Sequence, residues 1–247
     1  MRKLLVRFAR WLAALRNHGT PATQPIAVGE DSFALARREM VADQLVRRGR
    51  DITNPRVLDA MAKVPRHEFV PAHLRSHAYE DGPLPIGHGQ TISQPYVVAF
   101  MTEHLAPEPD DRVLEIGTGS AYQTAILAEL VAQVFTVEIV PELAQWATAN
   151  LRRLGYTNVQ LRLGSGWHGW PEAAPFDAII VTCAPDDVPQ TLITQLKDSG
   201  RMVVPVGKRC EQDVVVLRKH RGKLEQRAVL PVRFVPMVGS RAKEVER

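Results

Sequence analysis

Residues 112–138 read RVLEIGTGSAYQTAILAELVAQVFTVE, and their pattern indicates the fold class of the chain. A short β-type run ends on a carboxylate at Glu115 and is followed by a glycine turn at 117–119. A helix-like segment comes next, and a second β-type run then ends on another carboxylate, Glu138. Strand, glycine turn, helix, strand and acid is the order found in βαβ units that bind nucleosides.

The details of this stretch limit the kinds of ligand that it can bind. Glycines let the backbone approach a ligand without an intervening Cβ, and Glu138 lies 21 residues after Gly117, where a carboxylate can accept both ribose hydroxyls. Tyr122 occupies the position of the third glycine of a dinucleotide fingerprint. Glu115 would repel a pyrophosphate and suits a cationic ligand, such as the sulfonium and amino group of S-adenosylmethionine. The pattern favours a methyltransferase-type site over a dinucleotide site.

Size and composition fit a globular protein. The 247 residues can form one large α/β domain with added elements, or two small domains, and 45% of them are hydrophobic. No run approaches the roughly 18 apolar residues that a membrane span needs. Two cysteines, Cys183 and Cys210, argue against a disulfide framework and fit a reducing cytosol, so we expect a cytoplasmic protein.

The net charge of +4 is distributed unevenly along the chain. Residues 1–50 and 208–247 each carry a net charge of +6, whereas residues 51–207 carry −8. The acidic centre disfavours nucleic acid as a substrate of that segment. The pI of about 9.3 therefore reflects the two ends of the chain.

The N-terminal residues form a separate extension. Residues 1–16 predict a short basic amphipathic helix, and residues 17–30 predict a linker rich in proline, glycine and threonine. A membrane-surface contact, a targeting signal and a lightly docked extension are the alternatives for the helix, and the last is favoured. Arg7 and Arg10 interrupt the apolar run that a secretory signal needs.

Periodicity and capping residues predict the remaining elements. Helices are expected at 31–48, 54–62, 141–154 and 187–196, and further strands at 159–163, 176–181, 201–206, 213–219 and 224–234. The prolines and glycines between residues 64 and 101 predict a structured loop without regular secondary structure. Because it carries apolar and aromatic residues, we expect this loop to pack against the protein and to close over a ligand.

Five segments carry a more specific pattern: VPRHEFVP at 64–71, LPIGHGQTISQP at 84–95, VLEIGTGSAYQTAIL at 113–127, PFDAIIVTCAP at 175–185 and RMVVPVG at 201–207. In this order the segments resemble the protein-L-isoaspartate O-methyltransferases. The similarity extends from about Asp31 to Pro236. The LPIG and TISQP elements are more specific than the glycine turn, which many methyltransferases share.

The resemblance implies an α/β fold with a doubly wound, mostly parallel seven-stranded sheet of the class I methyltransferase type and with N-terminal helices. It implies one domain at 31–247, with a helical and substrate-loop part (31–95), a core that binds S-adenosylmethionine (96–207) and C-terminal strands (208–247). The implied reaction methylates the free α-carboxylate of an L-isoaspartyl residue in a damaged protein or peptide. The ester then collapses to a succinimide, whose opening partly restores aspartate.

This chemistry needs no general base, because a carboxylate with a pKa near 4 is already ionised at neutral pH. Alignment of oxygen, methyl and sulfur should supply catalysis, on the order of several kcal/mol through proximity. The resemblance to the family implies that Ser93 in TISQP is the catalytic residue. Its hydroxyl would hold the reacting carboxylate in line with the methyl group and the sulfur. The alternative interpretation of Ser93 is a turn or cap residue, which is the less favoured one even without the resemblance.

The resemblance also assigns binding residues. The expected cofactor-binding residues are Glu115 at the methionine end, Glu138 at the ribose, Gly117, Thr118, Gly119, Ser165 and Gly166. The expected substrate-binding residues are Gln90, Thr91 and Ile92. Ser165 stands where the family usually has an aspartate, so its hydrogen bond to the adenine should be weaker by about 1 kcal/mol. Ala121 replaces the last glycine of the usual turn and keeps a small side chain.

Other reactive residues receive structural interpretations. His73 and His77 have helical spacing, but no further ligands cluster with them, so no metal is expected. His88 is interpreted as a structural residue, and Cys183 as a small core residue rather than a nucleophile.

The expected partners are isoaspartyl proteins and peptides, without nucleic acid or a membrane span, and a monomer is expected. Two alternative functions retain the same fold. One is a methyltransferase with another carboxylate or a small molecule as acceptor. The other is a non-catalytic homologue that recognises isoaspartyl or C-terminal peptides. A dehydrogenase is the weakest alternative.

Overall fold

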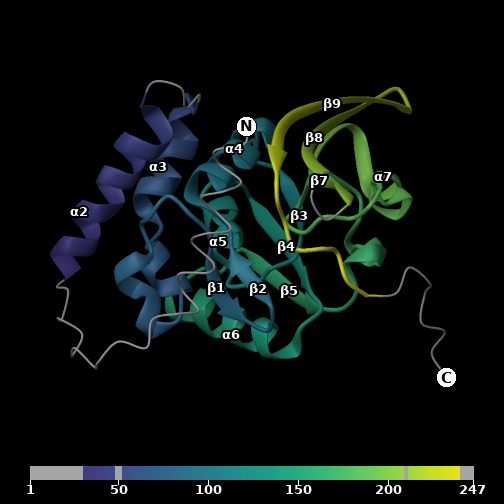
Figure 1. Ribbon diagram of the computed structural model, residues 1–247. Coiled ribbons are helices and arrows are strands. Elements are labelled where there is room, and N and C mark those ends of the chain that lie inside the picture. The colour runs from purple at the N-terminus through teal and green to yellow at the C-terminus, as the bar shows by residue number, and fades with distance from the viewer. Residues whose placement is uncertain (1–29, 48–51, 209–210, 240–247) are drawn as a thin grey trace.

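The computed structural model describes residues 30–47, 52–208 and 211–239 (Figure 1). The predicted helix at 1–16 and all but the last residue of the predicted linker at 17–30 lie outside the described residues, as does Cys210. The main strands are β3 (Arg112–Ile116), β4 (Gln133–Glu138), β5 (Val159–Leu163), β6 (Phe176–Val181), β7 (Leu196–Lys208), β8 (Glu211–His220) and β9 (Lys223–Val232).

These strands form one seven-stranded sheet in the order β5-β4-β3-β6-β7-β8-β9. The five strands β5, β4, β3, β6 and β7 run parallel to one another. Strand β8 is antiparallel to both β7 and β9. The prediction of a mostly parallel seven-stranded α/β sheet is confirmed. The chain passes from β3 outward to β5 and then returns to β6, so the strand order reverses beside β3, where open α/β sheets bind ligands.

Both faces of the central strands are buried. In β6, Ala178 and Ile180 belong to one apolar cluster, and Ile179 and Val181 belong to another. This alternation is expected of a parallel sheet that is covered on both sides. Figure 1 shows helices α2 and α3 beside one side of the sheet, away from α7, which lies next to β7.

The helical segments connect and cover the strands. They are α2 (Glu30–Met40), η1 (Val41–Val46), α3 (Pro55–Lys63), η2 (Arg66–Phe69), η3 (Ala72–His77), α4 (Pro95–Leu105), α5 (Tyr122–Ala128), α6 (Pro141–Arg153), η4 (Gly166–His168), η5 (Pro171–Ala173) and α7 (Gln190–Gln195). Helix α3 begins as predicted, because the Asn54 side chain accepts a hydrogen bond from the Arg56 N–H at 3.0 Å. None of the helices in the described part of the chain combines the length and apolar character needed to cross a bilayer.

The prediction of an irregular loop between residues 64 and 101 is wrong. This region contains η2, η3, the start of α4, and a hairpin of β1 (Leu84–Gly87) and β2 (Gln90–Ile92). His88 and Gly89 both have positive φ angles, 52° and 71°, as a tight two-residue hairpin turn requires. The glycines therefore permit the hairpin, and Pro95 starts α4 because proline is favoured in a first helical turn.

The predicted helix at 187–196 is also too long. In the structure, α7 has six residues, Gln190–Gln195. Pro189 precedes its first residue, and Leu196 already pairs with Phe176 as part of β7. The helix therefore begins three residues later than predicted, after Pro189, and ends one residue earlier, where β7 begins.

Candidate active site

Two adjoining pockets meet at the glycine turn, at the carboxyl end of the central strands. The Glu138 pocket includes the predicted residues Gln90, Thr91, Gly117, Gly119, Glu138 and Gly166. The Ser93 pocket includes the predicted residues Thr91, Ile92, Ser93, Gly117, Thr118 and Gly119. Both pockets share Thr91, Gly117, Gly119 and Thr182, so these residues stand between the two spaces.

Glu138 is held by three backbone donors at the end of β4. Its Oε2 accepts a hydrogen bond from the Gly119 N–H at 2.8 Å. Its Oε1 accepts from the Ile139 and Val140 N–H groups at 2.8 and 2.9 Å. The carboxylate is buried, lines its pocket and keeps lone pairs that hydroxyl groups of a ligand can reach.

The glycine turn passes closely between β4 and the residue after β6. Gly117 has a φ of 98°, and a Cβ there would lie 2.5 Å from Thr182 Oγ1. The Thr182 hydroxyl donates to the Gly117 carbonyl at 2.6 Å, which fixes the approach. Ala121, just before α5, also has a positive φ of 71°, so this residue adopts the left-handed conformation that glycine would adopt more readily. The left-handed conformation costs a residue with a Cβ about 1 kcal/mol.

Glu115 lies beneath the turn and lines neither pocket. It is fully buried, and its Oε2 accepts hydrogen bonds from Thr124 Oγ1 at 2.5 Å and Thr136 Oγ1 at 2.7 Å. No hydrogen-bond partner of Glu115 Oε1 is found among the described residues. Desolvation by burial raises the pKa of Glu115 to about 8, and the negative charge of Glu138 adds a smaller increase. The hydrogen bonds from the hydroxyls of Thr124 and Thr136 lower this pKa but do not offset the effect of burial. Direct contact between Glu115 and a ligand stays a prediction.

Ser93 lies between β2 and α4, on the wall of its pocket. The neighbouring Gln94 donates to Asp81 Oδ1 at 2.6 Å and so ties this junction to the preceding loop. Within the described part of the chain, the Ser93 hydroxyl makes no hydrogen bond to protein, so it can donate to a ligand. Val97 and Met101 of α4 line the same pocket.

Ser165 lies beside the C-terminal segment rather than on the wall of a pocket. A Cβ at Gly239 would lie 2.9 Å from Ser165 Oγ and 2.7 Å from Ile139 Cδ1. Gly239, with a φ of 103°, therefore lets this segment pack directly over Ser165. The predicted hydrogen bond from Ser165 to an adenine stays a prediction.

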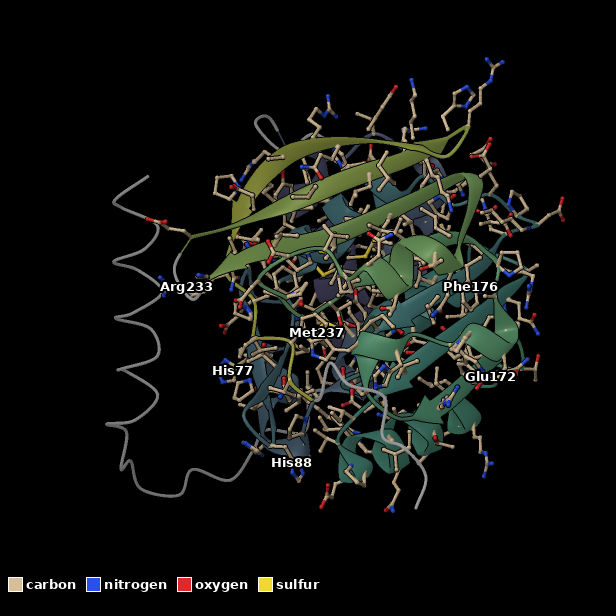
Figure 2. The ribbon with its side chains drawn as sticks, turned by 90° about the vertical axis from the view of Figure 1, so that its right-hand side faces the viewer. His77, His88, Glu172, Phe176, Arg233 and Met237 are labelled. Carbon is tan, nitrogen blue, oxygen red and sulfur yellow. The ribbon has the colours of Figure 1, made fainter. Side chains whose placement is uncertain are left out.

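The C-terminal segment at 235–238 lines the Glu138 pocket, although it was not among the residues predicted for the site. The Ala184 N–H donates to the Val235 carbonyl, and the Met237 N–H donates to the Ala184 carbonyl, both at 2.8 Å. Figure 2 shows Met237 toward the middle of the face drawn, although it follows the last strand. An apolar run within a basic tail was the signal that could have indicated a buried position.

The remaining candidates are one cysteine and three histidines. Desolvation and then Glu138 raise the pKa of Cys183 to about 12, so this half-buried thiol on the pocket wall stays protonated. His88 is exposed in the hairpin turn, at the lower edge of Figure 2, and its structural role stays a prediction. His73 and His77 are exposed, and no cluster suited to a metal ion occurs among the described residues.

Comparison with known proteins identifies the family. The sequence model of the family described as Protein-L-isoaspartate(D-aspartate) O-methyltransferase matches residues 36–242. A protein-L-isoaspartate O-methyltransferase of Opitutus terrae is 55% identical over 201 residues, which cover 81% of this chain and 85% of the relative.

Two solved structures are similar to this chain. A protein-L-isoaspartate O-methyltransferase aligns with a TM-score of 0.74 at 32% identity, over 83% of this chain and 66% of that longer chain. A Plasmodium falciparum relative in complex with S-adenosyl-L-homocysteine aligns with a TM-score of 0.73 over 82% of this chain and 98% of its own, and at 24% identity it supports the fold alone. The chain therefore belongs to the protein-L-isoaspartate O-methyltransferase family, which methylates isoaspartyl residues for protein repair with S-adenosylmethionine as methyl donor.

Proposed function

We propose that the Glu138 pocket holds S-adenosylmethionine and that the Ser93 pocket holds the free α-carboxylate of an L-isoaspartyl residue. The observation that carries this assignment is that the two pockets share Thr91, Gly117, Gly119 and Thr182. A methyl group at this junction would be within reach of an acceptor in the neighbouring space.

The residues of the Glu138 pocket fit this cofactor. The Glu138 carboxylate suits two ribose hydroxyls, because its backbone donors already fix its orientation. Ile139 and Met237 provide apolar walls for a flat base. A Cβ at Gly166 would lie 2.4 Å from Ile116 Cγ2, so a glycine at this position lets the backbone pack directly against Ile116 in the pocket wall. When bound, S-adenosylmethionine supplies an electrophilic methyl group on a positively charged sulfur.

The residues of the Ser93 pocket need only to orient the acceptor. The α-carboxylate is ionised at neutral pH, so no side chain has to remove a proton. The Ser93 hydroxyl donates a hydrogen bond to one carboxylate oxygen and leaves the other free to attack. Backbone groups of Thr91 and Ile92 hold the peptide beside it. This positioning accounts for catalysis through proximity and orientation.

The acceptors are isoaspartyl proteins and peptides in the cytoplasm, and the enzyme acts as a monomer. The low cysteine content and the acidic segment at 51–207 support this setting over an oxidising compartment or a nucleic-acid substrate. Light scattering on the purified full chain tests the monomer.

Methyl transfer with purified full chain tests the main proposal. An isoaspartyl peptide and its aspartyl twin are incubated with labelled S-adenosylmethionine, and ester formation is measured on each. Transfer to the isoaspartyl peptide alone is expected. Binding of S-adenosylmethionine without transfer to either peptide would favour another acceptor, and no binding at all would favour a non-catalytic homologue.

A further inference from the structure

A third cavity, of about 390 Å³, lies between the β1–β2 hairpin and α6. Ile86 of β1 and Trp146 of α6 form part of its wall, and Figure 1 shows these two elements next to each other near the bottom of the view. The cavity shares no lining residue with the Glu138 pocket or the Ser93 pocket. We call it the arginine cavity, because Arg75 and Arg153 belong to its wall.

The charged residues in the wall of the arginine cavity are two arginines and one glutamate. Arg153 Nη1 and Arg75 Nη2 lie 2.7 and 3.3 Å from Glu68 Oε2, so Glu68 holds both guanidinium groups in place. The side chains of Arg153 and Arg75 are nevertheless 48% and 45% exposed. Because a guanidinium group has five N–H donors, both arginines keep donors for a ligand. The wall therefore has a surplus of positive charge, although residues 51–207 as a whole carry −8.

Asn150 adds a buried amide to the same wall. The residue is only 6% exposed, and no hydrogen-bond partner of its Nδ2 is found in the described part of the chain. Its Oδ1 accepts a long hydrogen bond of 3.5 Å from Arg153 Nη2, which leaves the NH₂ group as the unused part of the amide. Buried polar groups are nearly always hydrogen-bonded, so this donor indicates a missing acceptor atom. Two guanidinium groups and one amide donor together suit a carboxylate.

Ile86 connects the arginine cavity with the candidate active site. It lines the cavity, and a Cβ at Gly119 would lie 3.4 Å from Ile86 Cδ1. Gly119 lines both the Glu138 pocket and the Ser93 pocket, so Ile86 stands between the cavity and the glycine turn. Strand β2, which pairs with β1, carries the predicted substrate-binding residues Thr91 and Ile92. A polypeptide held by this hairpin therefore has the arginine cavity close to its acceptor carboxylate.

We propose that the arginine cavity binds an acidic side chain of the acceptor polypeptide, close in sequence to the isoaspartyl residue. The inference rests on the proposed function, which places the acceptor carboxylate beside Ser93. Arg75 and Arg153 bind the acidic group, and Ile86 and Trp146 contact the apolar part of the same side chain. Because this contact lies away from the reacting atoms, it lowers KM for the acceptor and leaves kcat unchanged.

Steady-state methylation of a peptide series tests the inference on the purified full chain. Each isoaspartyl peptide carries a single glutamate at one of the successive positions on either side of the isoaspartyl residue, and its twin carries glutamine there. At one or more positions we expect glutamate to lower KM about three- to fivefold below the value for the twin, as a half-exposed ion pair can. The preference should weaken at high salt. If glutamate lowers KM at no position, the inference is overturned.

Arginine variants locate the preference in the cavity. Arg153→Gln and Arg75→Gln should each reduce it, and the double variant should abolish it. Arg152→Gln is the matched control, because Arg152 is exposed on the same helix and does not line the cavity. A preference that survives in the double variant would refute the inference while leaving the proposed function intact. Failure of the wild type to methylate any isoaspartyl peptide would refute the proposed function, and the inference with it.

Trp146 allows a measurement that does not depend on turnover. The full chain is mixed with S-adenosylhomocysteine and then with the preferred glutamate peptide or its glutamine twin, and tryptophan emission is recorded. The glutamate peptide should change the emission more than its twin at equal concentration, and Trp146→Phe should remove this difference because Trp146 lines the cavity. An equal difference in the wild type and in Trp146→Phe would place the glutamate elsewhere and contradict the inference.

Discussion

The backbone N–H of Gly119 donates a hydrogen bond of 2.8 Å to Glu138 Oε2 and so joins the glycine turn to the end of β4. The two parts of the nucleoside-binding unit are therefore one hydrogen-bonded assembly before a ligand binds. A ribose that binds to Glu138 would meet a carboxylate whose position the protein has already fixed. Fixed polar groups lower the ordering cost of binding.

Glu138→Gln tests this arrangement. Each oxygen of Glu138 accepts backbone hydrogen bonds, so an amide must present its NH₂ group to one of these donors. We expect the dissociation constant for S-adenosylmethionine to rise about tenfold and the free energy of unfolding to fall by about 1–2 kcal/mol. Calorimetry and urea unfolding measure the two effects, with Glu142→Gln as an exposed control. Unchanged affinity would show that Glu138 does not bind the cofactor.

Gly117→Ala tests the close approach of the turn. Its Cβ would lie 2.5 Å from Thr182 Oγ1 and would require a positive φ, whereas Gly222→Ala combines a positive φ with open space. Strain at a positive φ costs about 1 kcal/mol, and a side-chain clash adds about 1–3 kcal/mol. We therefore expect Gly117→Ala to unfold at clearly lower urea concentration than Gly222→Ala. Equal midpoints would mean that the contact with Thr182 is readily relieved.

Ser93→Ala tests the orientation of the acceptor. Removing its hydroxyl should lower kcat for an isoaspartyl peptide by about tenfold or more, because one hydrogen bond to a charged group contributes about 1.5–3 kcal/mol. Binding of S-adenosylmethionine should change little, since Ser93 lines the other pocket. Steady-state kinetics and calorimetry separate the two quantities, with the exposed Ser76→Ala as control. An unaltered kcat would remove Ser93 from the mechanism.

Glu115→Gln tests the buried acid through the pH dependence of stability. Desolvation raises the pKa of Glu115 from 4.5 to about 8 in the folded chain. Its contribution to stability is therefore fully present below pH 4.5 and is lost as the pH rises through 8. Between these values the wild type should lose about 1.4 kcal/mol of unfolding free energy per pH unit relative to Glu115→Gln. Urea unfolding from pH 5 to pH 8.5 measures this difference, and parallel curves would refute it.

Local pattern predicted the βαβ unit because all of its signals lie within one stretch. The apolar runs of β3 and β4, the glycine turn and the position of Glu138 each follow from residues close in sequence. The hairpin at 84–92 does not follow from local pattern, because glycine generally weakens regular structure, whereas the turn of this hairpin needs the positive φ angles that glycine permits.

Other parts of the site depend on contacts between distant residues. The C-terminal segment reaches the Glu138 pocket through the pairing of Pro236 with Ala184, for which no local pattern exists. The sequence also identified Glu115 as an acid at a strand end without indicating that its side chain is fully buried. Burial, which depends on the packing of distant residues, places Glu115 in hydrogen-bond contact with Thr124 and Thr136.

The most direct test of the account is methyl transfer to a pair of peptides that differ only in the linkage at one residue. Purified full chain receives labelled S-adenosylmethionine with the isoaspartyl peptide or with its aspartyl twin, and base-labile methyl ester is counted in each. The account predicts ester on the isoaspartyl peptide, little or none on its twin, and a loss of about tenfold or more in rate with Ser93→Ala. Equal labelling of the two peptides, or no labelling of either, would contradict it.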